Sequence, residues 1–177
     1  MDTKEATTHQ AALGTTPPRR PTAEDIALLT FAQKVEMTVR DLYDEAIDAK
    51  VFSDATVAET VITIREAHEA YSQSLSGLLG RVAPNTRDDT IFDELKQGFT
   101  GDAASAAAAA ADLENVAVAT HTDLLGQLVG TDGATLVASI LVVEARFATV
   151  LRALSGATSL TDQLNSQGKA LVPSTNQ

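Results

Sequence analysis

The 177-residue chain is long enough to form one domain with a buried core, and 44% of its residues are hydrophobic. It contains no cysteine, which excludes a disulfide framework and a thiolate metal site, so any metal would need oxygen and imidazole ligands. The formal net charge is −11, and the acidic surplus lies in the middle of the chain, which argues against nucleic acid or an anionic membrane as partner. Alanine and leucine are abundant while aromatic residues make up only 4%, a composition that favours an all-α fold.

The two ends of the chain differ in composition from its centre. Residues 1–22 are rich in Thr and Pro and show no helical spacing of apolar residues, so we expect a disordered N-terminal arm. No apolar stretch typical of a signal peptide follows Met1, and the longest apolar run, Leu136–Val143, is too short to cross a bilayer. The sequence therefore predicts a soluble, cytoplasmic chain, with a loosely ordered C-terminal tail at 157–177.

Apolar residues recur at helical spacing in four segments of the central region. These segments are residues 22–50, 54–80, 102–129 and 134–156. Thr22 has the form of a helix N-cap, and a tight turn at Gly130–Gly133 separates the last two segments. A longer connection, 81–101, joins the second segment to the third and includes a predicted short helix at 89–97. Four amphipathic helices with one long middle connection predict a four-helix bundle over residues 23–156.

An isolated carboxylate stands in the most apolar part of the fourth segment. The stretch Ile140–Leu151 is apolar almost throughout, yet it contains Glu144. A lone carboxylate on the buried face of a helix costs free energy unless another group neutralises it. The sequence thus raises the question of what neutralises Glu144.

The second and fourth segments share a spacing pattern. His68-Glu-Ala-Tyr71 precedes Gly80 by the same interval as Glu144-Ala-Arg-Phe147 precedes Gly156. In each half of the chain, a glutamate lies about 30 residues earlier, on the preceding helix. The two helical hairpins are therefore interpreted as a duplicated unit.

Folding two such hairpins together brings four polar residues to one place inside the bundle. These predicted metal ligands are Glu36, His68, Glu114 and Glu144. The arrangement is that of a carboxylate-bridged dimetal site, in which residues at i and i+3 share one helix face. Carboxylates that lie together in low dielectric need a cation or protons to balance them, so a divalent metal ion is the predicted partner.

The segment Ala138–Gly156 resembles the terminal segment of bacterial ferritin-like domain proteins, especially actinobacterial members, which reads close to A-S-I-L-x-V-E-A-x-H-A-x-V-L-R-x-L-x-G. The resemblance runs from about Asp25 to Gly156 and implies a ferritin-like bundle with a dimetal-carboxylate site. The family pattern has a histidine at the end of each i, i+3 pair, where this chain has Tyr71 and Phe147. Four of the usual six ligands remain, which implies a degenerate site with at most one tightly held metal.

Two functions stay open from the sequence. The first is binding of iron or manganese, with zinc also accepted; a bound iron could add weak ferroxidase activity. The second is a non-catalytic ferritin-like scaffold or stress-related interaction protein without a cofactor, which acts on a protein partner or a second copy through its surface or tails. Neutralising partners such as Arg40 or Tyr71 would favour the second function. His121 and Tyr43 are expected to be supporting or core residues rather than ligands, and whether the chain is an enzyme stays undecided.

Overall fold

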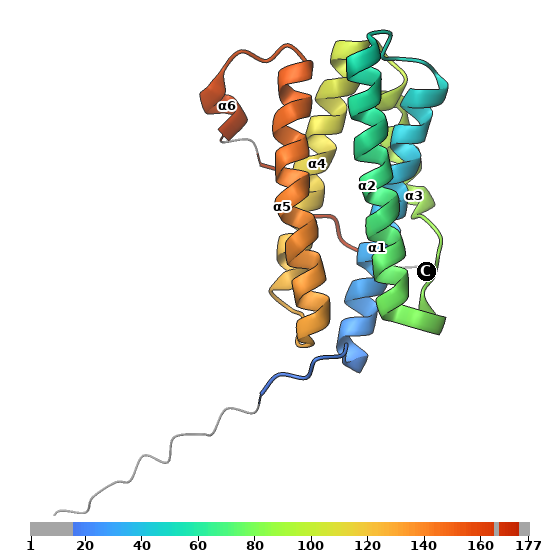
Figure 1. The fold of residues 1–177 in the computed structure, drawn as a ribbon, viewed down its shortest axis with the longest axis vertical. Coiled ribbons are helices and arrows are strands. Elements are labelled where there is room, and N and C mark those ends of the chain that lie inside the picture. Colours follow the sequence, from blue (N-terminus) through green and yellow to red (C-terminus); the bar gives the residue numbers. More distant parts are fainter. Residues whose placement is uncertain (1–15, 165–166, 174–177) are drawn as a thin grey trace, which may run out of the picture.

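The structure, a computed structural model, describes residues 16–164 and 167–173. Four long helices of this part of the chain form a bundle (Figure 1): α1 (Ala23–Asp48), α2 (Ala55–Leu79), α4 (Ala103–Leu125) and α5 (Thr131–Leu154). The connections contain the short helices α3 (Asp89–Leu95) and α6 (Leu160–Leu164) and the 3-10 turns η1 (Gly80–Val82) and η2 (Lys96–Phe99). The described residues contain no β-strand, so the all-α four-helix prediction is confirmed.

The bundle consists of two closely packed helix pairs, α1 with α2 and α4 with α5. The pairs meet along α1 with α4 and along α2 with α5, while α3 and η2 cover α1 beside them. Leucine and isoleucine side chains such as Leu42, Ile64 and Ile140 are fully or almost fully buried between the helices. Ala107 and Ala111 of the alanine-rich run are also buried, because small side chains let α4 approach its neighbours closely.

Asp25 ties the start of α1 to the start of α5. The Thr22 hydroxyl accepts a hydrogen bond from the Asp25 backbone, and the Asp25 carboxylate accepts one from the Thr22 backbone, which confirms Thr22 as the N-cap. The same carboxylate accepts from the backbone N–H groups of Val129 and Gly130, both at 2.8 Å. A Cβ atom at Gly130 would lie 2.9 Å from Asp25 Oδ2, so this contact requires glycine.

Replacing Asp25 with alanine is expected to lower the free energy of unfolding by about 2–4 kcal/mol, because backbone N–H groups at both helix starts lose their acceptor. Burial alone would raise the pKa of Asp25, but the hydrogen bonds from Thr22, Val129 and Gly130 lower it. Its stabilising contribution is therefore present above the unfolded-state pKa of about 3.9 and is lost as the pH falls through the folded-state pKa. Urea unfolding at pH 7 and pH 3 measures both effects, with the exposed Glu24→Ala as control. A loss at pH 7 within 0.5 kcal/mol (about the scatter of surface substitutions) would contradict the assignment.

The junction between α4 and α5 differs from the sequence prediction. Helix α4 ends at Leu125, about four residues earlier than predicted, and α5 already begins at Thr131. The predicted turn at Gly130–Gly133 is therefore wrong for all but Gly130, which caps α5. Gly133 lies in the first turn of α5, where an added Cβ would lie 3.2 Å from the Leu29 side chain. This glycine serves helix packing instead of a turn.

The early start of α5 has a partner in the predicted N-terminal arm. The backbone N–H groups of Thr131 and Asp132 donate to the carbonyl oxygens of Pro18 and Arg19, both at 2.9 Å. These bonds satisfy two of the N–H groups that a helix start leaves free. The end of the arm is thus attached to the bundle, while residues 1–15 lie outside the described residues.

Part of the predicted C-terminal tail packs on α4. In the segment 167–173, the Leu171 backbone donates to the Thr120 hydroxyl at 2.9 Å, and the Leu171 side chain packs against the core. Gly168 approaches α4 so closely that an added Cβ would lie 2.3 Å from the Val116 backbone nitrogen. This part of the tail is thus in contact with the bundle.

Helix α5 is long and strongly apolar. By length and composition alone it could cross a membrane, although the short run Leu136–Val143 by itself could not. One such helix is weak evidence, since core helices of soluble proteins meet the same criterion. In this fold α5 packs against α4 and contributes Val137, Ile140 and Leu151 to the core.

Candidate metal centre

Five ionisable side chains of the described region meet inside the bundle and have no exposed surface. They are Glu36 on α1, His68 on α2, Glu114 and His121 on α4, and Glu144 on α5. The structure thus brings together the four residues nominated from the sequence and adds His121. All four long helices contribute to this buried cluster, as the duplicated hairpins require.

Helix periodicity sets the positions of the α1 and α4 side chains. Glu114 and His121 lie seven residues apart, which is close to two helical turns, and so they point to the same side of α4. Glu36 and Tyr43 have the same spacing on α1. Each of these helices therefore presents two polar groups at successive levels of the bundle interior.

His68 lies between two carboxylates. Its Nδ1 atom is 2.8 Å from Glu36 Oε2, and its Nε2 atom is 3.1 Å from Glu114 Oε1. Burial alone would lower the pKa of His68, but Glu114 and Glu36 together raise it well above its usual range. The Tyr43 hydroxyl donates to the same Glu114 oxygen at 2.5 Å, and burial together with Glu114 raises the pKa of Tyr43.

His121 faces Glu144 and the second oxygen of Glu36. Its Nδ1 atom is 2.9 Å from Glu144 Oε2, and its Nε2 atom lies 3.3 Å from Glu36 Oε1 without hydrogen-bond geometry. Burial alone would lower the pKa of His121, but Glu144 and then Glu36 raise it. The hydrogen-bond partner of Glu144 is therefore a histidine on the neighbouring helix.

Several buried atoms of this cluster have no hydrogen-bond partner among the described residues. They are Glu36 Oε1, Glu114 Oε2, His121 Nε2 and Glu144 Oε1. Buried polar atoms without partners are rare, and each one calls for an explanation such as an ion. We call Glu36, His121 and Glu144 the first position, because one ligand atom from each lies within 4.8 Å of the other two. This spacing is compatible with one metal ion.

Electrostatics also distinguish Glu144. Burial raises the pKa of Glu144 to about 7; His121 acts against this, and Glu36 adds to it. A carboxylate in this setting gains from any additional cation nearby, because like charges at short range disfavour one another. The first position thus combines donor atoms for a metal with a charge that is not fully balanced.

Arg40 and Tyr71, the two neutralising partners considered from the sequence, make no hydrogen bond to a site carboxylate in the described part of the chain. Arg40 contacts its neighbour Asp41, at 2.8 Å from Nε, instead of Glu36. The Tyr71 hydroxyl makes no hydrogen bond to any residue of the described segments, and burial and then Glu36 raise its pKa to about 12. Tyr71 and Phe147 pack against the core as predicted, and it is Tyr43 that donates to a site carboxylate.

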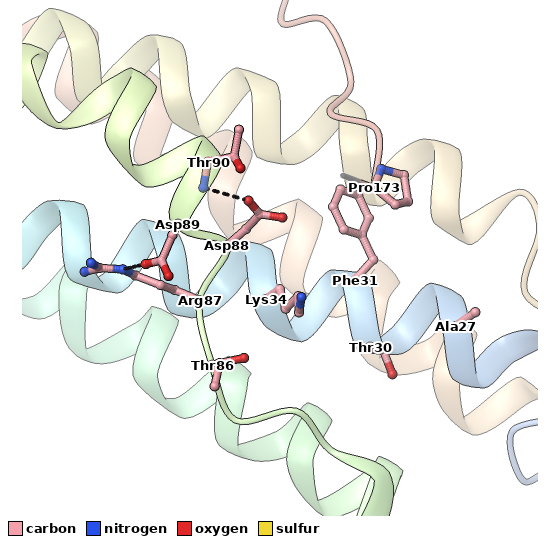
Figure 2. Close-up of a pocket in the computed structure, with 10 residues that line it drawn as sticks. All are labelled: Ala27, Thr30, Phe31, Lys34, Thr86, Arg87, Asp88, Asp89, Thr90 and Pro173. Carbon is pink, nitrogen blue, oxygen red and sulfur yellow. Dashed lines mark hydrogen bonds and ion pairs between the residues drawn. The ribbon is translucent and has the colours of Figure 1, made fainter. Parts of the chain in front are cut away.

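A surface pocket of about 480 Å³ lies between α1, the start of α3 and Pro173 (Figure 2). None of the five cluster residues lines it. Three of its charged groups already have protein partners: Arg87 pairs with Asp89 at 2.8 Å, and Asp88 caps α3 by accepting from the Thr90 backbone. The buried cluster is therefore the stronger candidate for function.

His121 is the cluster residue whose role the sequence pattern did not reveal. Its spacing from Glu114 repeats the spacing of Tyr43 from Glu36, and this repeat was the available signal. A histidine on an apolar face more often fills the core than binds a ligand, so periodicity alone did not distinguish it. The short distance from His121 on α4 to Glu144 on α5 follows from how these two helices pack.

Comparison with known proteins agrees with this arrangement. Residues 24–157 match the family model described as a ferritin-like domain. Neither the curated proteins nor the solved structures contain a match. The matched region spans all four bundle helices and every residue of the buried cluster. The chain belongs to the ferritin-like domain family.

Proposed function

We propose that the protein binds one divalent transition-metal ion inside the bundle, held by Glu36, His121 and Glu144. The observation that carries this proposal is that these three fully buried side chains each have an atom without a hydrogen-bond partner, and that one ligand atom of each lies within 4.8 Å of the other two. Two carboxylates and one imidazole form a donor set that suits iron or manganese, and zinc is also accepted.

The residues of the first position fit such an ion in charge and in donor type. To act as a metal ligand, His121 needs a neutral ring with one nitrogen free. Its contact with Glu144 fixes the orientation of the ring. Glu36 offers Oε1 to the site while its Oε2 atom stays with His68, so that contact orients this carboxylate. When bound, iron or manganese would supply Lewis-acid and one-electron redox chemistry at this place.

A binding experiment tests this proposal. Metal-free protein is titrated with Mn²⁺, Fe²⁺ (without oxygen) and Zn²⁺ by calorimetry, beside Glu144→Gln and the exposed control Glu66→Gln. We expect saturable binding to the wild type and to the control, and at least 100-fold weaker binding to Glu144→Gln, since a charged ligand is lost. Equal affinity in Glu144→Gln would refute this ligand assignment.

A second candidate function is a scaffold that has retained the fold without a metal. The observation in its favour is that His68, His121 and Tyr43 already pair with the buried carboxylates of Glu36, Glu114 and Glu144. Absence of binding in the wild type for all three metals would support this function. A protein that binds no iron at this place would have no ferroxidase activity there. Oxygen consumption with ferrous ion is therefore measured only if iron binding is found.

A further inference from the structure

The internal duplication gives the first position a counterpart within the same cluster. The first position takes Glu36 from one hairpin and its other two ligands, His121 and Glu144, from the other hairpin. The equivalent set, with the hairpins exchanged, consists of Glu114 from α4, Tyr43 from α1 and His68 from α2. We call these three residues the second position. Glu114 corresponds to Glu36, but a tyrosine (Tyr43) stands in the place of His121 and a histidine (His68) in the place of Glu144.

In the second position, hydrogen bonds converge on one oxygen of Glu114, while its Oε2 atom has no partner among the described residues. The Tyr43 hydroxyl donates to Glu114 Oε1 at 2.5 Å, and His68 Nε2 lies 3.1 Å from the same oxygen. In the first position all three residues leave an atom without a partner, whereas in the second position Glu114 alone does so among the three. A metal ion held by all three of these residues would have to displace both contacts at Glu114 Oε1.

The His68 side chain is also held in place by its neighbours. Its ring stacks on Tyr43 with centroids 5.7 Å apart, meets Tyr71 edge-on at 5.9 Å, and lies 6.1 Å from the ring of Phe147. Its second nitrogen contacts Glu36, a residue of the first position. Aromatic packing on several sides leaves the ring little freedom to turn away from Glu114.

We infer that His68 and Tyr43 close the second position to metal, so that the chain binds a single ion where its duplicated fold provides two equivalent places. The two residues determine metal stoichiometry and do not act as ligands. This inference rests on the proposed function, because it presupposes an ion at the first position. The sequence-based prediction of His68 and Glu114 as ligands is tested by the same experiment.

The test rebuilds the second position with the residue types of the first. The double variant Tyr43→His/His68→Glu gives Glu114 one imidazole and one carboxylate as neighbours. We expect metal content, measured by mass spectrometry after loading with Mn²⁺, to rise from one ion per chain to two. We also expect electron paramagnetic resonance to change from an isolated to a spin-coupled Mn²⁺ signal. The control Thr63→His/Gln73→Glu adds the same residue types at exposed places on α2 and should stay at one.

The possible outcomes separate the inference from the proposed function. Two ions per chain in the wild type would overturn the inference and leave metal binding intact. One ion in a folded double variant would also overturn the inference. No ion in either protein would overturn the proposed function and the inference with it.

A second measurement uses the wild type and does not depend on the folding of the variant. Nitrogen-15 resonances of the histidine rings are recorded while zinc is added to the full chain, and His121→Asn assigns the signals. We expect the ring nitrogens of His121 to show the large shift of zinc coordination while those of His68 keep their metal-free pattern. A coordination shift at His68 would overturn the inference.

Discussion

Replacing His68 with leucine is expected to lower the free energy of unfolding of the metal-free protein by about 3–5 kcal/mol. The imidazole is the partner of Glu36 Oε2 and one of two partners of Glu114 Oε1, and all three side chains have no exposed surface. Leucine fills a similar volume but has no N–H group to donate. Glu36 and Glu114 therefore each lose a hydrogen-bond partner and must take up protons to remain inside the bundle. Chemical unfolding with urea at pH 7 measures the loss.

The matched control for this variant is Glu66→Leu, two residues earlier on the exposed side of α2. Its effect should stay within about 0.5 kcal/mol, as for most surface substitutions. A loss below about 1 kcal/mol in His68→Leu would show that the carboxylates do not depend on this ring for their stability in the bundle.

Metal is expected to stabilise the wild-type protein by about 4 kcal/mol when its free concentration is 1,000 times the dissociation constant. The ion binds the folded bundle, where three helices bring Glu36, His121 and Glu144 together, and the unfolded chain has no such arrangement. Thermal unfolding with and without Mn²⁺ measures this effect as a rise in Tm. In His121→Asn the rise should fall to a small fraction of its wild-type size, because the imidazole ligand is lost.

An equal rise in Tm for wild type and His121→Asn would contradict the first position as the place of binding. It would point instead to acidic surface groups, which are numerous in a chain of net charge −11. Repeating the scan at high salt separates the two cases, since exposed charges are screened far more strongly than buried ones.

Much of the bundle could be predicted because its helices carry strong local signals. The N-cap at Thr22 and the apolar spacing of the four segments placed the long helices to within a few residues. The isolated Glu144, together with the duplication, also indicated where the buried cluster lies along the four helices. These features follow from local periodicity and from the cost of burying charge, which are both readable in one sequence.

Other features depended on contacts between distant parts of the chain. The start of α5 at Thr131 is set by carbonyl oxygens of Pro18 and Arg19, more than a hundred residues earlier. The hydrogen bond from Leu171 to Thr120 joins the tail to α4 across a sequence separation of 51 residues. Periodicity gives no access to such pairings, so the sequence prediction was wrong at the junction of α4 with α5 and did not include the contact of the tail with α4.

The roles of the polar residues within the cluster were the hardest to foresee. Spacing placed Tyr43 and His121 on the inner faces of their helices, but it could not say which carboxylate each would meet. The fold pairs Tyr43 with Glu114 and His121 with Glu144, which gives the two halves of a repeat different chemistry. These pairings come from the packing of the helices and cannot be read from spacing alone.

The measurement that tests the central claim most directly is anomalous X-ray diffraction from crystals of the full chain soaked with Zn²⁺. The account predicts one strong peak inside the bundle, about 2.0–2.2 Å from atoms of Glu36, His121 and Glu144. No peak within the bundle, or a peak between Glu114 and His68, would contradict it. In the first case the buried glutamates are held by histidines and tyrosine alone, and in the second the ion occupies the position that we assign as closed.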